Sequence, residues 1–252
     1  MDIAALCLFA FLAGIVDAVA GGGGLIQVPA LFAIFPSVPA AALLGTNKLS
    51  SVAGTATAAL RYGRSVPINW RSVLPAAFVA GLGAVVGAKT VTMVDPVLLR
   101  PCLVLMLSGM AGYTIARPDL GTKAGRASFR YGSVSFFSIA GAIGFYDGFF
   151  GPGAGSIMMF LLVKLFGHDF LSAAATTKVL NLATNFGALV LFAMTGNVLY
   201  AVALPMAACN VAGSWVGAHL AIKKGARFVR TVFVVVVAAL IGKVLLDLIS
   251  GQ

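Results

Sequence analysis

The sequence predicts an all-α polytopic integral membrane protein with two inverted repeats of about five helical segments each, including short hairpins at glycine-rich turns. Three observations lead to this fold class. Of the 252 residues, 60% are hydrophobic and only 10% are charged, whereas soluble domains carry about 25% charged residues. Basic residues gather between long apolar runs. Scarce residue types recur at an offset of 130 positions.

The hydrophobic content excludes a soluble fold, because a chain of this length could not bury so much apolar surface in water. The net charge of +10 could indicate a nucleic-acid partner. However, eleven of the 17 Lys and Arg residues lie in three stretches between apolar runs, at 61–71, 117–130 and 223–230. This is the positive-inside pattern of cytoplasmic loops, so we expect the lipid bilayer and no nucleic acid as partner.

The cysteines indicate neither a metal site nor a disulfide framework. Cys7, Cys102 and Cys209 stand alone within apolar runs, where they behave as small buried hydrophobes. An enzyme would need paired acids, a metal cluster or a nucleophile beside its base, and the sequence offers no such cluster. We therefore expect no cofactor, no metal and no catalytic residue, and an intramembrane enzyme is the weakest alternative.

The third observation is an internal repeat. A shift of 130 residues aligns scarce residue types without a gap, which chance would not produce in an apolar composition. The matched pairs are Asp17 and Asp147, Thr46 and Thr176, Lys48 and Lys178, Pro75 and Pro205, and Arg100 and Arg230. The predicted organisation is a first repeat over 1–116, a basic cytoplasmic linker over 117–130 and a second repeat over 131–252.

Apolar segments divide each repeat into five parts. They run over 3–20, 24–36, 40–60, 73–94 and 98–116, with counterparts at 131–150, 155–167, 170–194, 199–222 and 228–249. The second segment of each repeat is too short to cross easily, since a span needs about 20 residues. Each follows a glycine-rich turn, so 3–36 and 131–167 are predicted helical hairpins, either re-entrant or fully spanning.

Loop charges predict that the repeats are inverted. Loop 61–71 is basic while its counterpart 191–201 carries no charge, and 219–230 is far more basic than 89–100. Equivalent loops therefore fall on opposite sides of the membrane, with both termini outside the cytoplasm. Inverted repeats of this kind are typical of secondary transporters, whose substrate sites lie near the midplane on broken helices.

The glycine-rich turns are the first predicted substrate-binding elements. Glycine allows positive φ and close backbone approach, and the N–H groups at a helix start bind anions. The alternative is that these glycines only permit tight turns and close packing. The residues are Gly21, Gly22, Gly23, Gly24, Gly151, Gly153 and Gly155.

Two lysines mark the second predicted element. Lys48 lies about eight residues into segment 40–60, or about 12 Å deep at 1.5 Å per residue, and Lys178 reaches a similar depth from the other side. A lysine near the bilayer centre is costly and marks a functional site. The predicted substrate-binding residues here are Thr46, Asn47, Lys48, Thr176, Thr177, Lys178 and Asn181, with Asn185 a further buried polar candidate.

Three roles for the lysines stay open. They contact the substrate, they form ion pairs with Asp17 and Asp147 that only fix the fold, or the aspartates and lysines couple transport to protons. These roles can overlap. Two lysines among neutral amides and hydroxyls favour an anionic substrate.

The motifs resemble those of the TauE/SafE sulfite exporter family, also called toluene-sulfonate uptake permeases. The resemblance rests on the run Gly14–Gly24, on Pro29 and on Gly45-Thr46-Asn47-Lys48, and it extends to Ala175-Thr176-Thr177-Lys178. It implies transport of sulfite, sulfonates, sulfoacetate or related organic anions across the bacterial inner membrane. Thr177 stands where the first repeat has Asn47, so the two half-sites differ.

The predicted function is therefore a secondary transporter that moves a small anion, of sulfur-containing type, by alternating access. The main alternative is an anion channel, which would pass an electrodiffusive current instead of a saturable, coupled flux. The anion, the direction, the coupling ion and the oligomeric state stay open, with a homodimer among the assemblies considered.

Overall fold

A computed structural model describes residues 2–93 and 133–250 of the chain. The described elements are helices, in the order α1 (Asp2–Ala20), α2 (Gly24–Ile34), α3 (Ala40–Ser65), α4 (Trp70–Met93), α6 (Ser133–Phe149), α7 (Ala154–Phe166), α8 (Phe170–Met194) and α9 (Tyr200–Ser250). The predicted helical class is confirmed. The predicted segment 98–116 and the linker 117–130 lie outside the described residues.

Four of these helices are long and apolar enough to cross a membrane. The stretches are Ile3–Ala20, Trp70–Met93, Phe170–Met194 and Tyr200–Phe233. The short helices α2 and α7 have 11 and 13 residues, which at 1.5 Å per residue is about half of a bilayer core. The fold is therefore that of a membrane protein with several spanning helices and two shorter ones.

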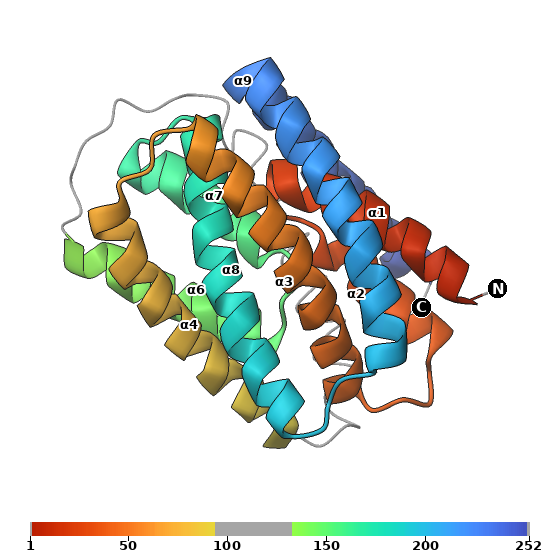
Figure 1. The fold of residues 1–252 in the computed structure, drawn as a ribbon. Helices are drawn as coiled ribbons and strands as arrows, with labels where there is room; N and C mark the ends of the chain where they lie inside the picture. The colour runs from red at the N-terminus through yellow and green to blue at the C-terminus, as the bar shows by residue number, and fades with distance from the viewer. Residues whose placement is uncertain (1, 94–132, 251–252) are drawn as a thin grey trace.

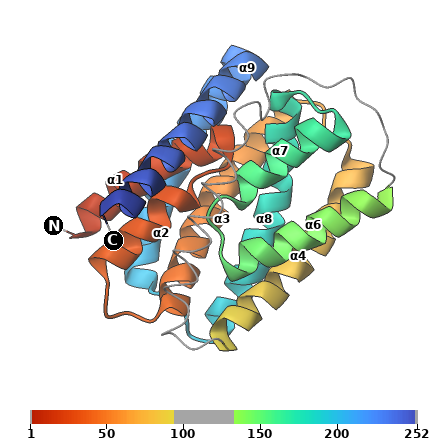
Figure 2. The ribbon, with the colours of Figure 1, turned by 180° about the vertical axis from the view of Figure 1, so that it is seen from behind.

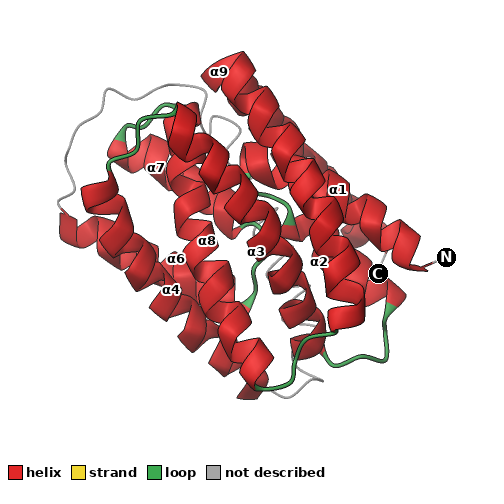
Figure 3. Cartoon of the chain, viewed as in Figure 1, coloured by secondary structure: helices red, strands yellow, loops and turns green. Residues whose placement is uncertain are grey.

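The glycine-rich turns form because the chain needs positive φ there. Gly21 has φ of 78°, and Gly151 and Gly153 have φ of 90° and 80°, values that glycine adopts without a steric penalty. At the first turn, α1 enters the bundle and α2 returns beside it; α6 and α7 form the second hairpin (Figures 1 and 2). The two turns lie near the middle of the molecule, as the green loops at the centre of Figure 3 show.

Helices α3 and α8 run side by side in opposite directions through the centre of the bundle (Figures 1 and 2). Their buried faces are unusually polar. The buried polar residues of α3 are Thr46, Asn47, Lys48, Ser50 and Thr55, and those of α8 are Thr176, Thr177, Lys178, Asn181, Thr184 and Asn185. Ionisable residues buried within membrane-spanning helices mark a candidate functional site.

Helix crossings on either side of this centre follow the 130-residue offset. Helix α1 packs on α9 and α4 packs on α6, in both cases through glycines. A Cβ on Gly83 would lie 2.4 Å from the Gly141 carbonyl oxygen, and one on Gly213 would lie 2.0 Å from that of Phe11. These glycine faces are packing surfaces, since a larger residue would leave no room for the backbones to approach so closely.

Helix starts follow the same offset. Gly24 and Ala154, Ala40 and Phe170, and Trp70 and Tyr200 begin equivalent helices. The basic loop expected at 223–227 takes the form of a break inside α9, where Gly225 has φ of 74° and ψ of −171°. A single glycine suffices to break the helix, because φ in this region interrupts the helical hydrogen-bonding pattern.

Candidate functional site

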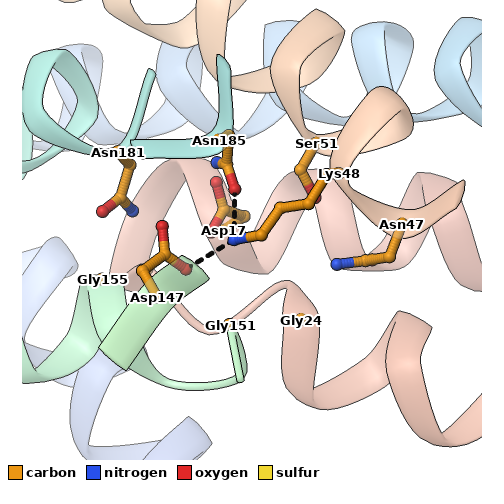
Figure 4. Close-up of a pocket in the computed structure, with 11 residues that line it drawn as sticks. Asp17, Gly24, Asn47, Lys48, Ser51, Asp147, Gly151, Gly155, Asn181 and Asn185 are labelled. Atoms are coloured by element: carbon orange, nitrogen blue, oxygen red, sulfur yellow. Dashed lines mark hydrogen bonds and ion pairs between the residues drawn. The ribbon is translucent and has the colours of Figure 1, made fainter. Parts of the chain in front are cut away.

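A polar pocket opens where the two glycine turns meet α3 and α8 (Figure 4). Its wall combines charged side chains, amides and glycine backbone. The lining residues are Asp17, Gly21, Gly24, Asn47, Lys48, Ser51, Asp147, Gly151, Gly155, Asn181 and Asn185. Nine of the predicted site residues are among them, so residues that are far apart in the sequence meet at one place.

One ion pair lies on the wall of this pocket. The Lys48 ammonium on α3 donates to Asp147 Oδ1 at 2.8 Å and to Asn185 Oδ1 at 2.9 Å. The other carboxylate oxygen of Asp147 accepts from the Thr184 hydroxyl. Both charged side chains are almost fully buried, at 3% and 6% exposure, and both residues line the pocket (Figure 4).

The second ion pair is sealed on its lysine side. The Lys178 ammonium on α8 donates to Asp17 Oδ2 at 2.8 Å, and the Lys178 side chain is 0% exposed. The other oxygen of Asp17 accepts from the Gly23 backbone N–H at 3.4 Å. Asp17 lines the pocket and is 18% exposed, whereas Lys178 is not part of the lining.

The pairing crosses between the two halves of the chain. Each lysine pairs with the aspartate of the other half, so Lys48 reaches α6 and Lys178 reaches α1. The predicted association of lysines with aspartates is thus present in the fold, while the sequence left the choice of partner open. Two positive and two negative groups cancel, and the site as folded is close to electrically neutral.

The glycine turns form the floor of the pocket and touch each other. A Cβ on Gly21 would lie 2.5 Å from the Gly155 carbonyl carbon, and the Ser156 hydroxyl donates to the Ala20 carbonyl at 2.8 Å. Helices α2 and α7 begin beside these turns without a side-chain cap. The start of a helix carries the positive end of its dipole, which suits a negatively charged ligand nearby.

Several buried polar atoms have no hydrogen-bond partner within the described part of the chain. They are Oδ1 of Asn47, Oγ of Ser50, Oγ1 of Thr177 and both amide atoms of Gln27. Leaving a buried polar group unmatched costs about 1–3 kcal/mol. Asn47 lines the pocket and its amide nitrogen points into it (Figure 4), so this side chain is placed to donate to a ligand.

Other predicted site residues lie outside the lining. The Thr46 hydroxyl donates to the Ala42 carbonyl at 2.6 Å and accepts from the Leu199 N–H at 2.9 Å, which ties α3 to the loop before α9. The remaining ones are Gly22, Gly23, Gly153, Thr176, Thr177 and Lys178. Of these, Gly153 has the positive φ of the second turn, and Gly23 and Lys178 hydrogen-bond to the lining residue Asp17.

The sequence reasoning missed part of the lining. Ser51 was not singled out, and Thr184 was not recognised as the partner of Asp147. The repeat itself holds the signal for Ser51, because an offset of 130 matches it to Asn181. Gln27, which is 1% exposed on the apolar helix α2, could have been flagged as an isolated polar residue in a short hydrophobic segment.

Comparison with known proteins gives a consistent result. Residues 6–244 match the family described as sulfite exporter TauE/SafE. A probable membrane transporter protein of Sinorhizobium is 38% identical over 97% of this chain and 93% of its own length. One from Haemophilus influenzae is 33% identical over 97% and 95%. One from Escherichia coli K12 is 35% identical over 96% and 89%. No solved structure matches the chain.

Proposed function

Since the chain belongs to the sulfite exporter TauE/SafE family of membrane transporters, and not to an enzyme family, we propose that it is a secondary transporter for a small anion. The substrate is a sulfur-containing anion of the sulfite, sulfonate or sulfoacetate type, and the membrane is the bacterial inner membrane. The observation that carries the proposal is the pocket in which Lys48, Asn47 and two glycine turns converge.

The chemistry of the wall supports an anionic substrate. Lys48 is the positive group that lines the pocket, and Asn47 adds an amide donor beside it. Helix starts at Gly24 and Ala154 add the positive ends of two helix dipoles. A sulfonate or sulfite offers three oxygens for such donors, and charge-assisted hydrogen bonds to it contribute about 1.5–3 kcal/mol each.

Alternating access between two inverted repeats is the second part of the proposal. The equivalent helix starts and the reciprocal packing of α1 on α9 and α4 on α6 support it. The hairpins α1–α2 and α6–α7 also enter from opposite ends of the bundle (Figures 1 and 2). In this scheme the repeats cover 1–116 and 131–252, and rocking of one against the other exposes the central pocket to each side in turn.

The experiment is a flux assay with purified protein in proteoliposomes. We expect saturable uptake of at least one anion from a panel of sulfite, methanesulfonate, toluenesulfonate, sulfoacetate and acetate, with the sulfur anions preferred. Saturation separates a transporter from a channel, which would give an electrodiffusive current instead. Absence of flux for every sulfur anion, with protein that is folded and inserted, would overturn the proposed substrate class.

Thiol labelling tests the inverted topology. In a variant without Cys7, Cys102 and Cys209, we expect a cysteine introduced at position 121 to be labelled only after reagents reach the cytoplasm. Labelling of that position from outside intact cells would contradict the inverted arrangement and leave the substrate assignment untouched.

A further inference from the structure

We propose that the transporter is proton-coupled and that Asp147 is the carboxylate that takes up the proton when the anion binds. This inference rests on the proposed function, since it concerns how the same pocket receives its anion. It assigns different tasks to the two ion pairs. Lys48–Asp147 exchanges partners during transport, and Lys178–Asp17 stays closed.

The charge balance of the site calls for a compensating ion. The two lysines are already neutralised by the two aspartates at 2.8 Å. A monovalent anion entering this buried place would therefore bring one uncompensated negative charge, which is costly in a medium of low dielectric constant. Protonation of one aspartate restores neutrality and frees the lysine beside it to bind the anion.

The surroundings of the two aspartates show which of them can accept a proton. The Thr184 hydroxyl has one hydrogen and lies within reach of two acceptors, Asp147 Oδ2 and the Asn181 carbonyl oxygen, the latter at 3.0 Å. When the hydroxyl donates to Asn181, its oxygen is free to accept a hydrogen bond from protonated Asp147. The same side chain can thus satisfy both states of this carboxyl group.

Asp17 has no such partner among the residues that the structure describes. Its second oxygen faces the Gly23 backbone N–H at 3.4 Å, and an N–H group can only donate. The residue matched to Thr184 by the repeat offset is Gly54, where a Cβ would lie 1.7 Å from Asn210 Oδ1. In the first half, side chains of α9 therefore occupy the space that a residue equivalent to Thr184 would fill.

Lys48 is held in place when its aspartate becomes neutral. Its second hydrogen-bond partner, Asn185 Oδ1 at 2.9 Å, keeps the ammonium on the pocket wall. Among the described residues, the charged groups that line the pocket with Asp147 are Lys48 from α3 and Asp17 from α1, and Tyr146 precedes Asp147 on α6. Helices α2 and α7 contribute glycine to the pocket lining.

Proton uptake can be measured without a transport assay. Methanesulfonate, toluenesulfonate and sulfoacetate are ionised at neutral pH. Because the first two carry only a sulfonate group, which does not take up a proton at this pH, the protons that leave the buffer when they bind are accepted by the protein. Calorimetric titration of each into the full-length protein, in buffers with different ionisation enthalpies, gives the number of protons bound per anion. We expect about one proton per monovalent anion bound.

Two variants assign the proton to its site. We expect Asp147→Asn to bring proton uptake to about zero and to abolish accumulation driven by a pH gradient, while exchange of labelled anion across the liposome membrane persists. In the charge-neutral double variant Asp17→Asn with Lys178→Met, which removes both members of the other pair, the proton uptake per bound anion should stay near one. Thr184→Val should weaken both proton uptake and affinity, by about tenfold for the latter, and Thr184→Ser should restore them.

The outcomes separate this inference from the proposed function. Binding of a sulfonate by the wild-type protein without proton uptake, or binding that requires Na⁺ in its place, overturns the inference and leaves an anion transporter. Undiminished proton uptake in folded Asp147→Asn also overturns it. Failure of all three sulfonates to bind folded protein overturns the proposed function itself.

Discussion

The two ion pairs at the centre of the bundle use the same residue types at matched positions, yet their surroundings differ. Lys48 has an amide as second partner and lines the pocket, and its aspartate also accepts from a hydroxyl. Lys178 is fully buried against Asp17, whose other oxygen meets backbone. The differences arise at two adjacent positions of the repeat. Gly54 and Thr55 in the first half correspond to Thr184 and Asn185 in the second.

This contrast shows how two similar repeats can differ in the roles of their equivalent ion pairs. Repetition supplies two lysine–aspartate pairs, and a few substitutions around one of them create hydrogen-bonding groups that can adjust to a ligand. In the other pair the lysine is fully buried, and only Asp17, which is 18% exposed, reaches the pocket. We therefore expect the two pairs to respond differently to removal of charge, and the following experiments test that expectation.

The largest expected effect on stability comes from breaking the Lys178–Asp17 ion pair. Asp17→Asn leaves the fully buried Lys178 ammonium without its counter-charge, and removing one partner of a buried pair costs about 3–5 kcal/mol. Asp147→Asn should cost less, because Lys48 keeps Asn185 and reaches the pocket. Thermal unfolding of the purified variants in detergent measures the difference.

A double variant serves as the control. Asp17→Asn combined with Lys178→Met removes both charges, so stability should recover most of what the single variant lost. If Asp17→Asn unfolds at the wild-type temperature, the Lys178–Asp17 ion pair does not stabilise the fold, and the proposed difference between the two pairs is wrong.

At the helix crossings, we expect equivalent substitutions in the two halves to reduce stability by equal amounts. A Cβ on Gly87 would lie 2.1 Å from the Phe145 carbonyl oxygen, and one on Gly217 would lie 2.5 Å from that of Ile15. Alanine at either position forces the backbones apart, at a cost of about 1–3 kcal/mol. Equal losses in melting temperature would show that the halves differ at the site and not in their packing.

Gly63→Ala is the matched control for the glycine variants. Gly63 lies on α3, and the atom nearest to an added Cβ is on the Trp70 ring at 3.4 Å. Alanine there should be neutral or slightly stabilising, since glycine inside a helix is unfavourable by about 0.5–1 kcal/mol. A large loss at Gly63, or none at Gly87 and Gly217, would contradict the packing described above.

The smallest expected effect concerns the starts of α3 and α8. Asp169 caps α8 by accepting from the Leu171 and Ser172 N–H groups at 2.9 and 3.0 Å, whereas Pro39 precedes α3 without a side-chain cap. Burial alone would raise the pKa of Asp169, but hydrogen bonds from the Ser172 hydroxyl and these N–H groups outweigh it and lower the pKa. Asp169→Ala should cost about 1 kcal/mol at neutral pH.

The sign of the pH dependence follows from the lowered pKa. The contribution of Asp169 is fully present above the ordinary aspartate pKa of 3.8 and is lost as the pH falls through the lower pKa of the folded protein. The gap in unfolding temperature between wild type and Asp169→Ala should therefore close in acid. A gap that stays constant with pH would exclude the capping carboxylate as its cause.

Much of the fold could be predicted from the sequence, because apolar length, glycine turns and basic loops each report directly on membrane insertion. The boundaries 24, 40 and 170 of the predicted segments coincide with the starts of α2, α3 and α8. The course of the chain at 223–227 was less predictable. A cluster of Lys and Arg is typical of a cytoplasmic loop. In the structure this stretch belongs to α9, which is interrupted there at Gly225.

The candidate site was predictable in its residue types and not in its partners. Scarcity and repetition singled out Lys48, Lys178, Asp17 and Asp147 as a set. Which lysine meets which aspartate depends on how α6 and α1 cross α3 and α8, and no local pattern contains that information. The role of Thr184 was missed for the same reason, since its partner Asp147 lies on another helix.

The central claim is that Lys48 is the anion ligand and Lys178 is not. Calorimetric titration of the best-binding sulfonate into Lys48→Met tests it most directly, because methionine keeps the apolar stem and removes the charge. The account predicts an affinity loss of about tenfold to a hundredfold. The Lys178→Met protein, stabilised by Asp17→Asn, should lose distinctly less. Wild-type affinity in folded Lys48→Met would contradict the account and leave the lysines as structural partners of the aspartates.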